Sequence, residues 1–276
     1  MIELPEALTI ARQLTAEVAG KKIAEAVRGN SPHKFAFYSG TPDDYARVLK
    51  GKTVGNARGD GPFIVARMGA SHVLLLGCGG EKILYHPGAD TVPGKHQLLL
   101  RFTDGTFLSV GVSGWGFVQL LAERDLETHP HAGKAGVSPL GDAFTWRYFN
   151  GLFEDASGDP GRSLKAFMIS KPGIWGVGNG CLQDILFTAG LHPRRRLESM
   201  DGKARRTLYN ATRSVLSEMT EKSGRDTEWD LYGNPGGYAK VLDRSHAGEP
   251  CPVCGATIEK IAFLGGASYF CPKCQK

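Results

Sequence analysis

The chain has 276 residues, 41% of them hydrophobic and 22% charged, with a mildly basic net charge of +5. This composition is typical of a folded globular protein, and the length allows two domains with separate cores. No apolar run reaches the ~20 residues of a membrane-spanning helix, and the first residues include acids where a signal peptide has basic and then apolar residues. We therefore expect a soluble intracellular protein with no membrane partner.

An N-terminal helix followed by a β-rich half is predicted for residues 1–125. Apolar residues recur at helical spacing over residues 5–20, and Gly20 suits the position after a helix end. Short β-rich runs then follow one another without helical patterns between them, which favours an antiparallel sandwich or barrel. Asp104-Gly105 is a strong hairpin turn. The clearest runs are 34–39, 63–68, 72–76, 97–102 and 106–110.

A polar, glycine-rich segment at 126–140 is predicted to link this half to a helical one. Its histidines, His129 and His131, are interpreted as solvated and not as metal ligands. A glycine-rich loop at 232–247 leads to the C-terminal cysteines. We expect an α+β protein with a helical domain at 141–247 and a cysteine-rich module at 248–276. Helical patterns lie at 142–153, 162–170, 180–190 and 200–222.

Two features of the helical half suggest phosphate binding. The segment from Arg194 to Arg213 holds seven basic and two acidic residues, and such a face could neutralise phosphates. A solvated helix surface explains the same charges equally well. Glycines in the loop 171–179, just before a predicted helix, could turn backbone N–H groups toward a phosphate. A tight turn between two helices is the alternative for that loop.

Four cysteines at the C-terminus predict a metal site. Cys251-x2-Cys254 and Cys271-x2-Cys274 are separated by sixteen residues, enough for a hairpin with strands at 257–263 and 267–270. Each pair can place two thiolates on one tetrahedral ion. Because cysteine fills all four positions, we expect one structural Zn²⁺ and no open coordination position. The other two cysteines of the chain stand alone in the sequence.

Several motifs together resemble a family of base-excision repair enzymes. Glu3-Leu-Pro-Glu6, the β-rich half, Gly178-Asn179, Gly190-Leu-His-Pro193 and the ending Cys271-Pro-Lys-Cys-Gln-Lys276 occur in this order. The whole chain is similar to the formamidopyrimidine-DNA glycosylase / endonuclease VIII family. The resemblance implies a helix plus β-sandwich, a helix–two-turns–helix domain at 141–247 and a zinc ribbon at 248–276. It also implies a monomer at the nucleoid, with duplex DNA carrying a damaged base or abasic site in the cleft between the domains.

The catalytic residues that the resemblance implies are only partly present. Family members attack the sugar C1′ with an N-terminal proline, and Ile2 stands at the matching position. We expect Met1 to be retained before the bulky isoleucine, which moves the free amine ~3.8 Å outward. The Met1 amine could form an imine in principle, but we expect lyase activity to be weak or absent. Glu3 matches the acid beside the nucleophile, and Glu6 matches a second acid of the motif; both could instead serve only to start a helix.

The resemblance also implies a set of DNA contacts. Lys165 and Asn179 match phosphate-contacting positions. Gly266 takes the position of an arginine of the ribbon, and Lys260 or Lys273 is a candidate to replace that arginine. Two further departures from the family pattern are Asp60 in place of a hairpin lysine and Asp184 in place of a longer acid. The family also fills the gap left by an extruded base with a methionine, an arginine and a phenylalanine. At these three positions the chain has Cys78, Gly114 and Trp115, respectively. Trp115 could act as such a wedge or belong to the core.

Two classes of function therefore remain open from the sequence. One is a divergent DNA glycosylase in which Glu3 positions or activates the nucleophile, with an ordinary bifunctional lyase as a variant of it. The other is a non-catalytic relative that binds damaged DNA. The identity of the base is expected to depend on the loop 232–247 and on the shape of the pocket.

Overall fold

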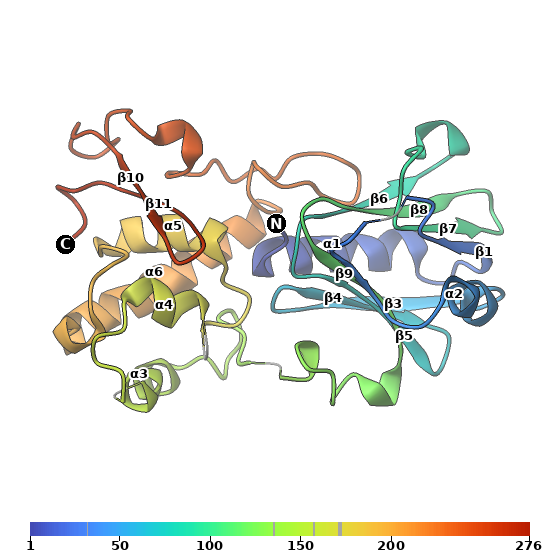
Figure 1. Ribbon diagram of the computed structural model, residues 1–276, viewed down its shortest axis with the longest axis horizontal. Coiled ribbons are helices and arrows are strands. Elements are labelled where there is room, and N and C mark those ends of the chain that lie inside the picture. Colours follow the sequence, from blue (N-terminus) through green and yellow to red (C-terminus); the bar gives the residue numbers. More distant parts are fainter. Residues whose placement is uncertain (32, 135, 157, 171–172) are drawn as a thin grey trace. The chain divides into compact units, whose positions relative to one another are not determined.

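The computed structural model of the chain describes residues 1–31, 33–134, 136–156, 158–170 and 173–276 (Figure 1). They form two compact units. The first comprises Met1–Ala135 with Lys222–Gly237, and the second comprises Gly136–Glu221 with Tyr238–Lys276. The chain therefore returns to the first unit after the helical segment and then leaves it again.

Two β-sheets make up most of the first unit (Figure 1). The four-stranded sheet has the order β1-β7-β8-β6, and the five-stranded sheet has the order β2-β9-β5-β4-β3. Their buried valines, leucines, isoleucines and phenylalanines form one core, as β-branched and large apolar side chains do between facing sheets. The strands are β1 (Ile23–Arg28), β2 (Ala36–Tyr38), β3 (Val54–Asp60), β4 (Phe63–Met68), β5 (His72–Gly77), β6 (Glu81–His86), β7 (Leu98–Phe102), β8 (Phe107–Val112) and β9 (Gly116–Ala122).

Helix α1 (Leu4–Val18) runs along this sandwich and packs against β3 and β4. Pro5 lies in its first turn, where the missing N–H has no intrahelical partner to lose. The apolar residues on its inner face, Ile10 and Leu14 among them, are at most 2% exposed. The second helix of this unit, α2 (Pro42–Leu49), begins at Thr41, whose hydroxyl caps the Asp44 amide.

Strand β2 pairs with β9 in parallel, with Phe37 opposite Phe117. The other strand pairs recorded in the two sheets are antiparallel. β2 is three residues long and forms one edge of its sheet, so the aromatic residues around it remain partly exposed.

Helices and a short hairpin form the second unit. Helix α5 packs against α6 and against β11 of the hairpin. Gly190 ends α5 in the left-handed conformation, at φ 66°, which glycine adopts without strain. The elements are α3 (Trp146–Asp155), α4 (Leu164–Ile169), α5 (Asn179–Ala189), α6 (Gly202–Glu221), β10 (Glu259–Phe263) and β11 (Gly266–Phe270).

The α+β architecture with a C-terminal ribbon is confirmed. The boundary between the units, after residue 135, falls inside the segment 126–140 that we assigned to a linker. Ala135 lies outside the described residues, as do Lys171 and Pro172 of the predicted glycine-rich loop. The finer division of the C-terminal half stays a prediction. Lys222–Gly237, which the sequence analysis placed with the helices, belongs to the first unit. No helix in the described ranges is long and apolar enough to cross a membrane.

Candidate functional site

A buried ion-pair cluster lies at the start of α1. Glu3, Glu6 and Arg225 are each 2% exposed. The Arg225 guanidinium donates to Glu3 Oε1 at 3.1 Å, to Glu6 Oε1 at 2.9 Å and to Glu6 Oε2 at 2.7 Å. Buried charges require such partners, because desolvation of an unpaired ion costs several kcal/mol. With both acids ionised, the cluster carries one negative charge in excess.

The same cluster fixes the first residues of the chain. Arg225 also donates to the Met1 carbonyl at 2.7 Å, and Glu6 Oε2 accepts from the Glu3 amide at 3.0 Å. Ile2 is 3% exposed, and its amide donates to the Gly79 carbonyl at 2.8 Å. The Met1 ammonium pairs with Glu228. Ile2, which stands where the sequence analysis expects a nucleophilic proline, is therefore a buried anchor.

Arg225 had no signal in the sequence. It follows α6, 222 residues after Glu3, and no local pattern relates an arginine after a helix to two acids at the N-terminus. Glu3 and Glu6 form a capping box at the start of α1, as helix-start acids do. Arg225 is an additional partner that the two acids share.

Two glycine-containing loops pack backbone to backbone beside the N-terminus. One contains Cys78 and Gly79, and the other contains Trp115. A Cβ on Gly79 would lie 1.9 Å from the Trp115 carbonyl oxygen, so only glycine permits this approach. Glu81, 7% exposed, joins the loops: its carboxylate accepts from the Gly79 amide at 2.9 Å and from the Phe117 amide at 2.8 Å.

Burial controls the titration of both acidic groups of these loops. It raises the pKa of the Glu81 carboxyl to about 7, against the lowering effect of its backbone hydrogen bonds. Burial, with the charges of Glu81 and Glu3, raises the pKa of the Cys78 thiol to about 12. Cys78 thus remains a neutral thiol at physiological pH. Glu81 was missed by the sequence analysis, since an acid at the start of an alternating strand gives no sign of being buried.

Trp115 lies at the surface and not in the core. Its side chain is 39% exposed, as a wedge residue requires, and it contacts the rings of Phe37 and Phe117 at centroid distances of 6.5 and 6.2 Å. The interpretation of His129 as a solvated linker residue was wrong: its ring is 8% exposed and bonds to Gln119. His131, in contrast, is exposed.

In the second unit, Lys165 and Asn179 converge on the ribbon hairpin. The Lys165 ammonium donates to the Phe263 carbonyl at 2.8 Å and to the Ser268 hydroxyl at 3.0 Å, and burial lowers its pKa. The Asn179 amide donates to the Ala267 carbonyl at 3.0 Å. A Cβ on Gly266 would lie 3.7 Å from Asn179 Nδ2 and 3.9 Å from Lys165 Nζ. Both side chains therefore hold the hairpin beside Gly266, the position where the sequence analysis expects an arginine.

Lys260, a predicted DNA contact, and Asp184, which replaces a longer acid, differ in exposure. Lys260 is exposed on β10 and free to approach an anion. Asp184 is buried and accepts from the Val241 and Leu242 amides at 3.0 and 2.9 Å, so it braces the loop that leads to the ribbon. Burial is also the main cause of the raised pKa of Asp184.

The four C-terminal cysteines form one metal site. The Sγ atoms of Cys251, Cys254, Cys271 and Cys274 all lie within 4.8 Å of one another. Pairs of them are 3.9 and 3.5 Å apart, close to the roughly 3.7–4 Å edge of a tetrahedral zinc–thiolate site with Zn–S bonds near 2.3 Å. The donor set fits one structural Zn²⁺ with no position left for a substrate.

Known proteins show the same combination of features. A model of the formamidopyrimidine-DNA glycosylase N-terminal domain matches residues 1–111, and a model of the zinc finger found in FPG and IleRS matches 248–276. A protein named formamidopyrimidine-DNA glycosylase from Rhodopseudomonas palustris is 28% identical over the full length of both chains, and one from Gluconobacter oxydans is 27% identical. The Fpg of Lactococcus lactis, in complex with DNA containing an abasic site, superposes with a TM-score of 0.83 at 23% identity, covering 99% of each chain.

These features define an α+β protein with a helix-bearing β-sandwich, a helical unit and a four-cysteine zinc ribbon. Residues 1–111 and 248–276 match models of formamidopyrimidine-DNA glycosylase domains, and the whole chain is similar to proteins of that name. It carries Ile2, Asp60 and Gly266 where the sequence analysis expects a proline, a lysine and an arginine.

Proposed function

We propose that the protein binds duplex DNA containing a damaged base or abasic site and hydrolyses the N-glycosidic bond of the damaged nucleotide. It acts as a monomer at the nucleoid, with little or no strand-cleaving lyase activity. The observation that carries this proposal is the buried Glu3–Arg225–Glu6 cluster at the start of α1. The names of the full-length relatives support the same activity.

In this reaction the bond between C1′ and the base nitrogen breaks, and the base leaves with the bonding electrons. C1′ acquires positive charge, which the net negative charge of the cluster stabilises. Water then forms the new C1′–O bond, and the proton that it loses passes to the base, which left with the bonding electrons. Glu3, held by Arg225 at 3.1 Å, positions this water through its carboxylate. Arg225 is a positioning residue, because it acts through the two acids.

The absence of lyase chemistry follows from the state of the N-terminal nitrogens. The Ile2 nitrogen is a peptide amide that donates to the Gly79 carbonyl, and an amide is no nucleophile toward C1′. The Met1 nitrogen is ion-paired with the Glu228 carboxylate. Imine formation with the sugar therefore lacks a free amine.

A non-catalytic DNA-binding protein is the second candidate. It is favoured by the burial of Glu3, whose side chain is 2% exposed and ion-paired, since such a carboxylate is less available to water. The zinc ribbon and the exposed Trp115 serve this function as well as they serve catalysis.

A panel of DNA lesions distinguishes the glycosylase from the non-catalytic DNA-binding protein. Duplexes carrying oxidised purines, oxidised pyrimidines, uracil or an abasic site are incubated with wild type, Glu3→Gln and the matched control Asp43→Asn, an exposed acid in the first turn of α2. Base release by wild type and Asp43→Asn, but not by Glu3→Gln, is the expected result. Binding without release from any duplex would favour the second candidate. Borohydride trapping on the abasic duplex is expected to give no adduct.

A further inference from the structure

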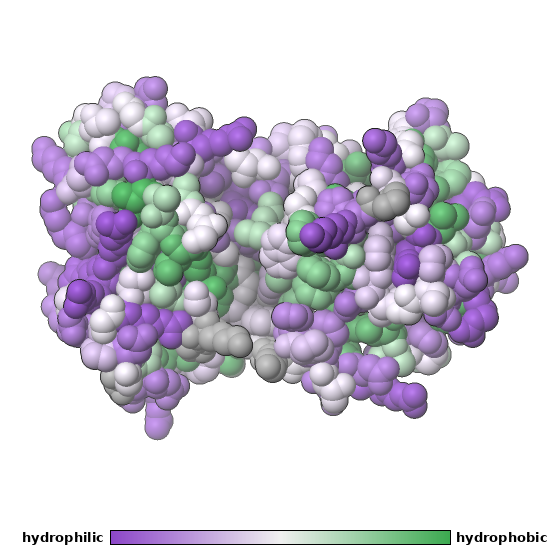
Figure 2. Space-filling view, viewed as in Figure 1, coloured by the Kyte–Doolittle hydropathy of each residue, from purple (hydrophilic) through white to green (hydrophobic). Residues whose placement is uncertain are grey.

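A cavity of about 550 Å³ in the second unit is lined largely by cationic side chains. Its volume falls in the range of small-molecule sites. Its walls come from the segment between α5 and α6 and from the end of the ribbon. His192, Arg194, Arg195, Arg196, Glu198 and Lys276 are among the lining residues. Hydrophilic residues cover much of the outer edge of this unit in Figure 2, so the arrangement of the arginines, and not charge alone, has to mark a site.

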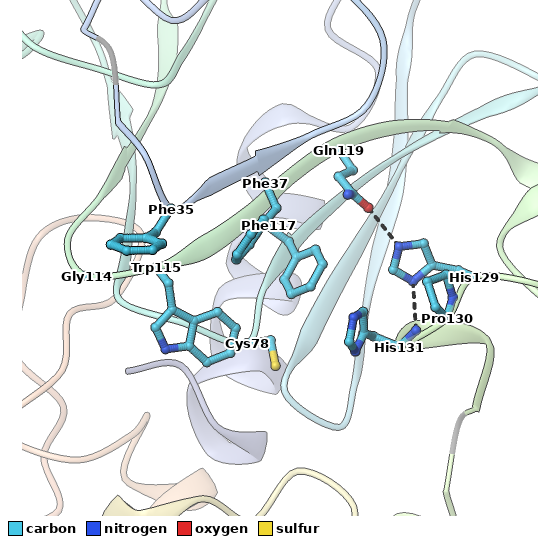
Figure 3. Close-up of a pocket in the computed structure, with 10 residues that line it drawn as sticks. All are labelled: Phe35, Phe37, Cys78, Gly114, Trp115, Phe117, Gln119, His129, Pro130 and His131. Atoms are coloured by element: carbon cyan, nitrogen blue, oxygen red, sulfur yellow. Dashed lines mark hydrogen bonds between the residues drawn. The ribbon is translucent and has the colours of Figure 1, made fainter. Parts of the chain in front are cut away.

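This cavity is separate from the one beside the N-terminal site. The cavity of the first unit has aromatic walls, with Phe37, Trp115 and Phe117 among its lining residues (Figure 3). It also contains Cys78 and therefore belongs to the region already described. In contrast, all the described residues that line the cavity of the second unit are polar or charged, which suits an anion.

A tight turn brings three consecutive arginines to the cavity. The Arg195 amide donates to the His192 carbonyl at 2.9 Å, which closes a four-residue β-turn. Pro193 occupies the second position of this turn, where proline is favoured. Consecutive side chains of an extended strand alternate between two sides. The turn instead allows Arg194, Arg195 and Arg196 to line one cavity.

Two of the guanidinium groups are held in place by other contacts. Arg195 donates to the Ser199 carbonyl at 3.0 Å and to the Lys276 main-chain oxygen at 3.4 Å. The guanidinium carbon of Arg194 lies 5.1 Å from the centroid of the Phe263 ring. This cation–π contact restricts the side chain and leaves its N–H donors unused. Because both groups are already ordered, less side-chain entropy is lost when an anion binds.

His192 adds a donor of defined position. Its Nδ1 accepts from the Arg194 amide at 3.1 Å, so a neutral His192 carries its proton on Nε2. The ring packs edge-on against Phe270, with the centroids 4.3 Å apart. Burial, and then the charge of Arg194, lower the pKa of His192 against a smaller raising effect of Glu259, which favours the neutral form.

The positive charge of the cavity is poorly compensated. Glu198 is the acid among the described residues that line it. Arg196 Nη1 lies 3.6 Å from Glu198 Oε1, and the two side chains are 67% and 50% exposed, so the pair is weak. Within the described ranges, Arg194 and Arg195 have no aspartate or glutamate partner. An anion in the cavity would therefore meet uncompensated guanidinium groups.

We propose that this cavity binds a phosphate group. Guanidinium groups bind phosphate oxygens through paired N–H donors, and donors from several directions suit a tetrahedral anion better than a planar carboxylate. Lys165 and Asn179 are not among the lining residues, so the site is distinct from the hairpin contacts. The phosphate can come from the backbone of bound DNA or from a free phosphorylated molecule. The first source rests on the proposed function, which supplies the DNA, and the second does not.

Inorganic phosphate tests the site without DNA. The full zinc-loaded chain is titrated by calorimetry at constant ionic strength, with acetate as a planar control anion. Wild type is expected to bind phosphate at least about tenfold more tightly than acetate. The double variant Arg194→Gln, Arg196→Gln changes two exposed side chains and spares Arg195, which braces the loop. It is expected to lose this preference. Arg147→Gln, at an exposed position of α3 in the same unit, is expected to keep it.

The salt dependence of DNA binding distinguishes the two sources. Affinity for an abasic duplex is measured by fluorescence anisotropy in phosphate-free buffer at several salt concentrations. A slope of log affinity against log salt that falls by about one for each lost contact, in the double variant but not in Arg147→Gln, assigns the site to the DNA backbone. An unchanged slope together with a lost phosphate preference assigns it to a free ligand.

The inference is overturned if the double variant matches wild type both in the phosphate preference and in the salt slope. It is also overturned if Arg147→Gln changes both quantities as much as the double variant does, since the effect would then be one of net charge. A wild type that binds no duplex overturns the proposed function alone, because the phosphate titration still decides the site.

Discussion

The carboxylate of Glu81 accepts a hydrogen bond from the backbone amide of Phe117 at 2.8 Å. Through this bond and a second one from the Gly79 amide, the single buried carboxylate of Glu81 connects the loop that contains Cys78 with strand β9.

The first prediction concerns pH. Burial raises the folded-state pKa of Glu81 from 4.5 to about 7, so the folded state binds a proton in this interval that the unfolded state has released. The stabilisation from this group is complete below pH 4.5 and is lost as pH rises through 7. The loss is on the order of 3 kcal/mol. Glu81→Gln is expected to flatten the fall in unfolding free energy between pH 5 and 8, measured by urea denaturation. An unchanged slope would contradict it.

The second prediction concerns Arg225. Arg225→Met leaves Glu3 and Glu6 buried without a counter-charge, which is expected to lower the free energy of unfolding by about 3–5 kcal/mol. Arg101→Met breaks an exposed pair with Glu25, 48% and 57% exposed, and is expected to cost at most about 1 kcal/mol. Equal effects in chemical denaturation would show that the buried cluster does not stabilise the fold.

The third prediction concerns zinc. Cys254→Ser removes one of four ligands, and the zinc content, measured by atomic absorption, is expected to fall well below one ion per chain. Cys78→Ser, outside the ribbon, is expected to leave the content unchanged. Chelation is expected to expose the small core of Leu242 and Ile258 that surrounds the buried cysteines, since such sites fold with their metal. A full zinc content in Cys254→Ser would contradict the four-cysteine site.

The fourth prediction concerns a positive charge introduced at Gly266. A Cβ on Gly266 meets its nearest neighbours at 3.7 Å or more, so Gly266→Arg fits without strain. The arginine would join Lys165 and Asn179 at the hairpin, and the slope of log affinity for DNA against log salt is expected to steepen by about one. Gly266→Gln, of similar length and no charge, is expected to leave the slope unchanged. A steepening in both variants would rule out a phosphate contact by the guanidinium.

The sequence predicted the elements with strong local signals. The run 63–68 coincides with β4, and 5–20 contains nearly all of α1. The cysteine spacing predicted the metal site because a tetrahedral ion restricts the geometry. Strand β2 pairs in parallel with β9 across eighty residues, from Ala36 to Gly116, and no local pattern encodes such a pairing.

The sequence analysis singled out two acids of the candidate site, Glu3 and Glu6, but not Arg225 or Glu81. Glu3 and Glu6 belong to a short motif, whereas Arg225 and Glu81 acquire their importance only through tertiary contacts. Lys165 was assigned a phosphate contact, which stays a prediction; in the structure its ammonium bonds to the hairpin. A residue's type can be read from the sequence, whereas the neighbour that its charged group contacts depends on the folded structure.

The long separation between Glu3 and Arg225 has a consequence for synthesis. A ribosome produces the two acids first and the guanidinium 222 residues later, after the whole segment 136–221 of the second unit. Until then the nascent sandwich contains two carboxylates without their counter-ion. The first unit therefore completes its folding only after most of the chain has been translated, and a truncated chain ending before Arg225 would emerge without an assembled acid pair.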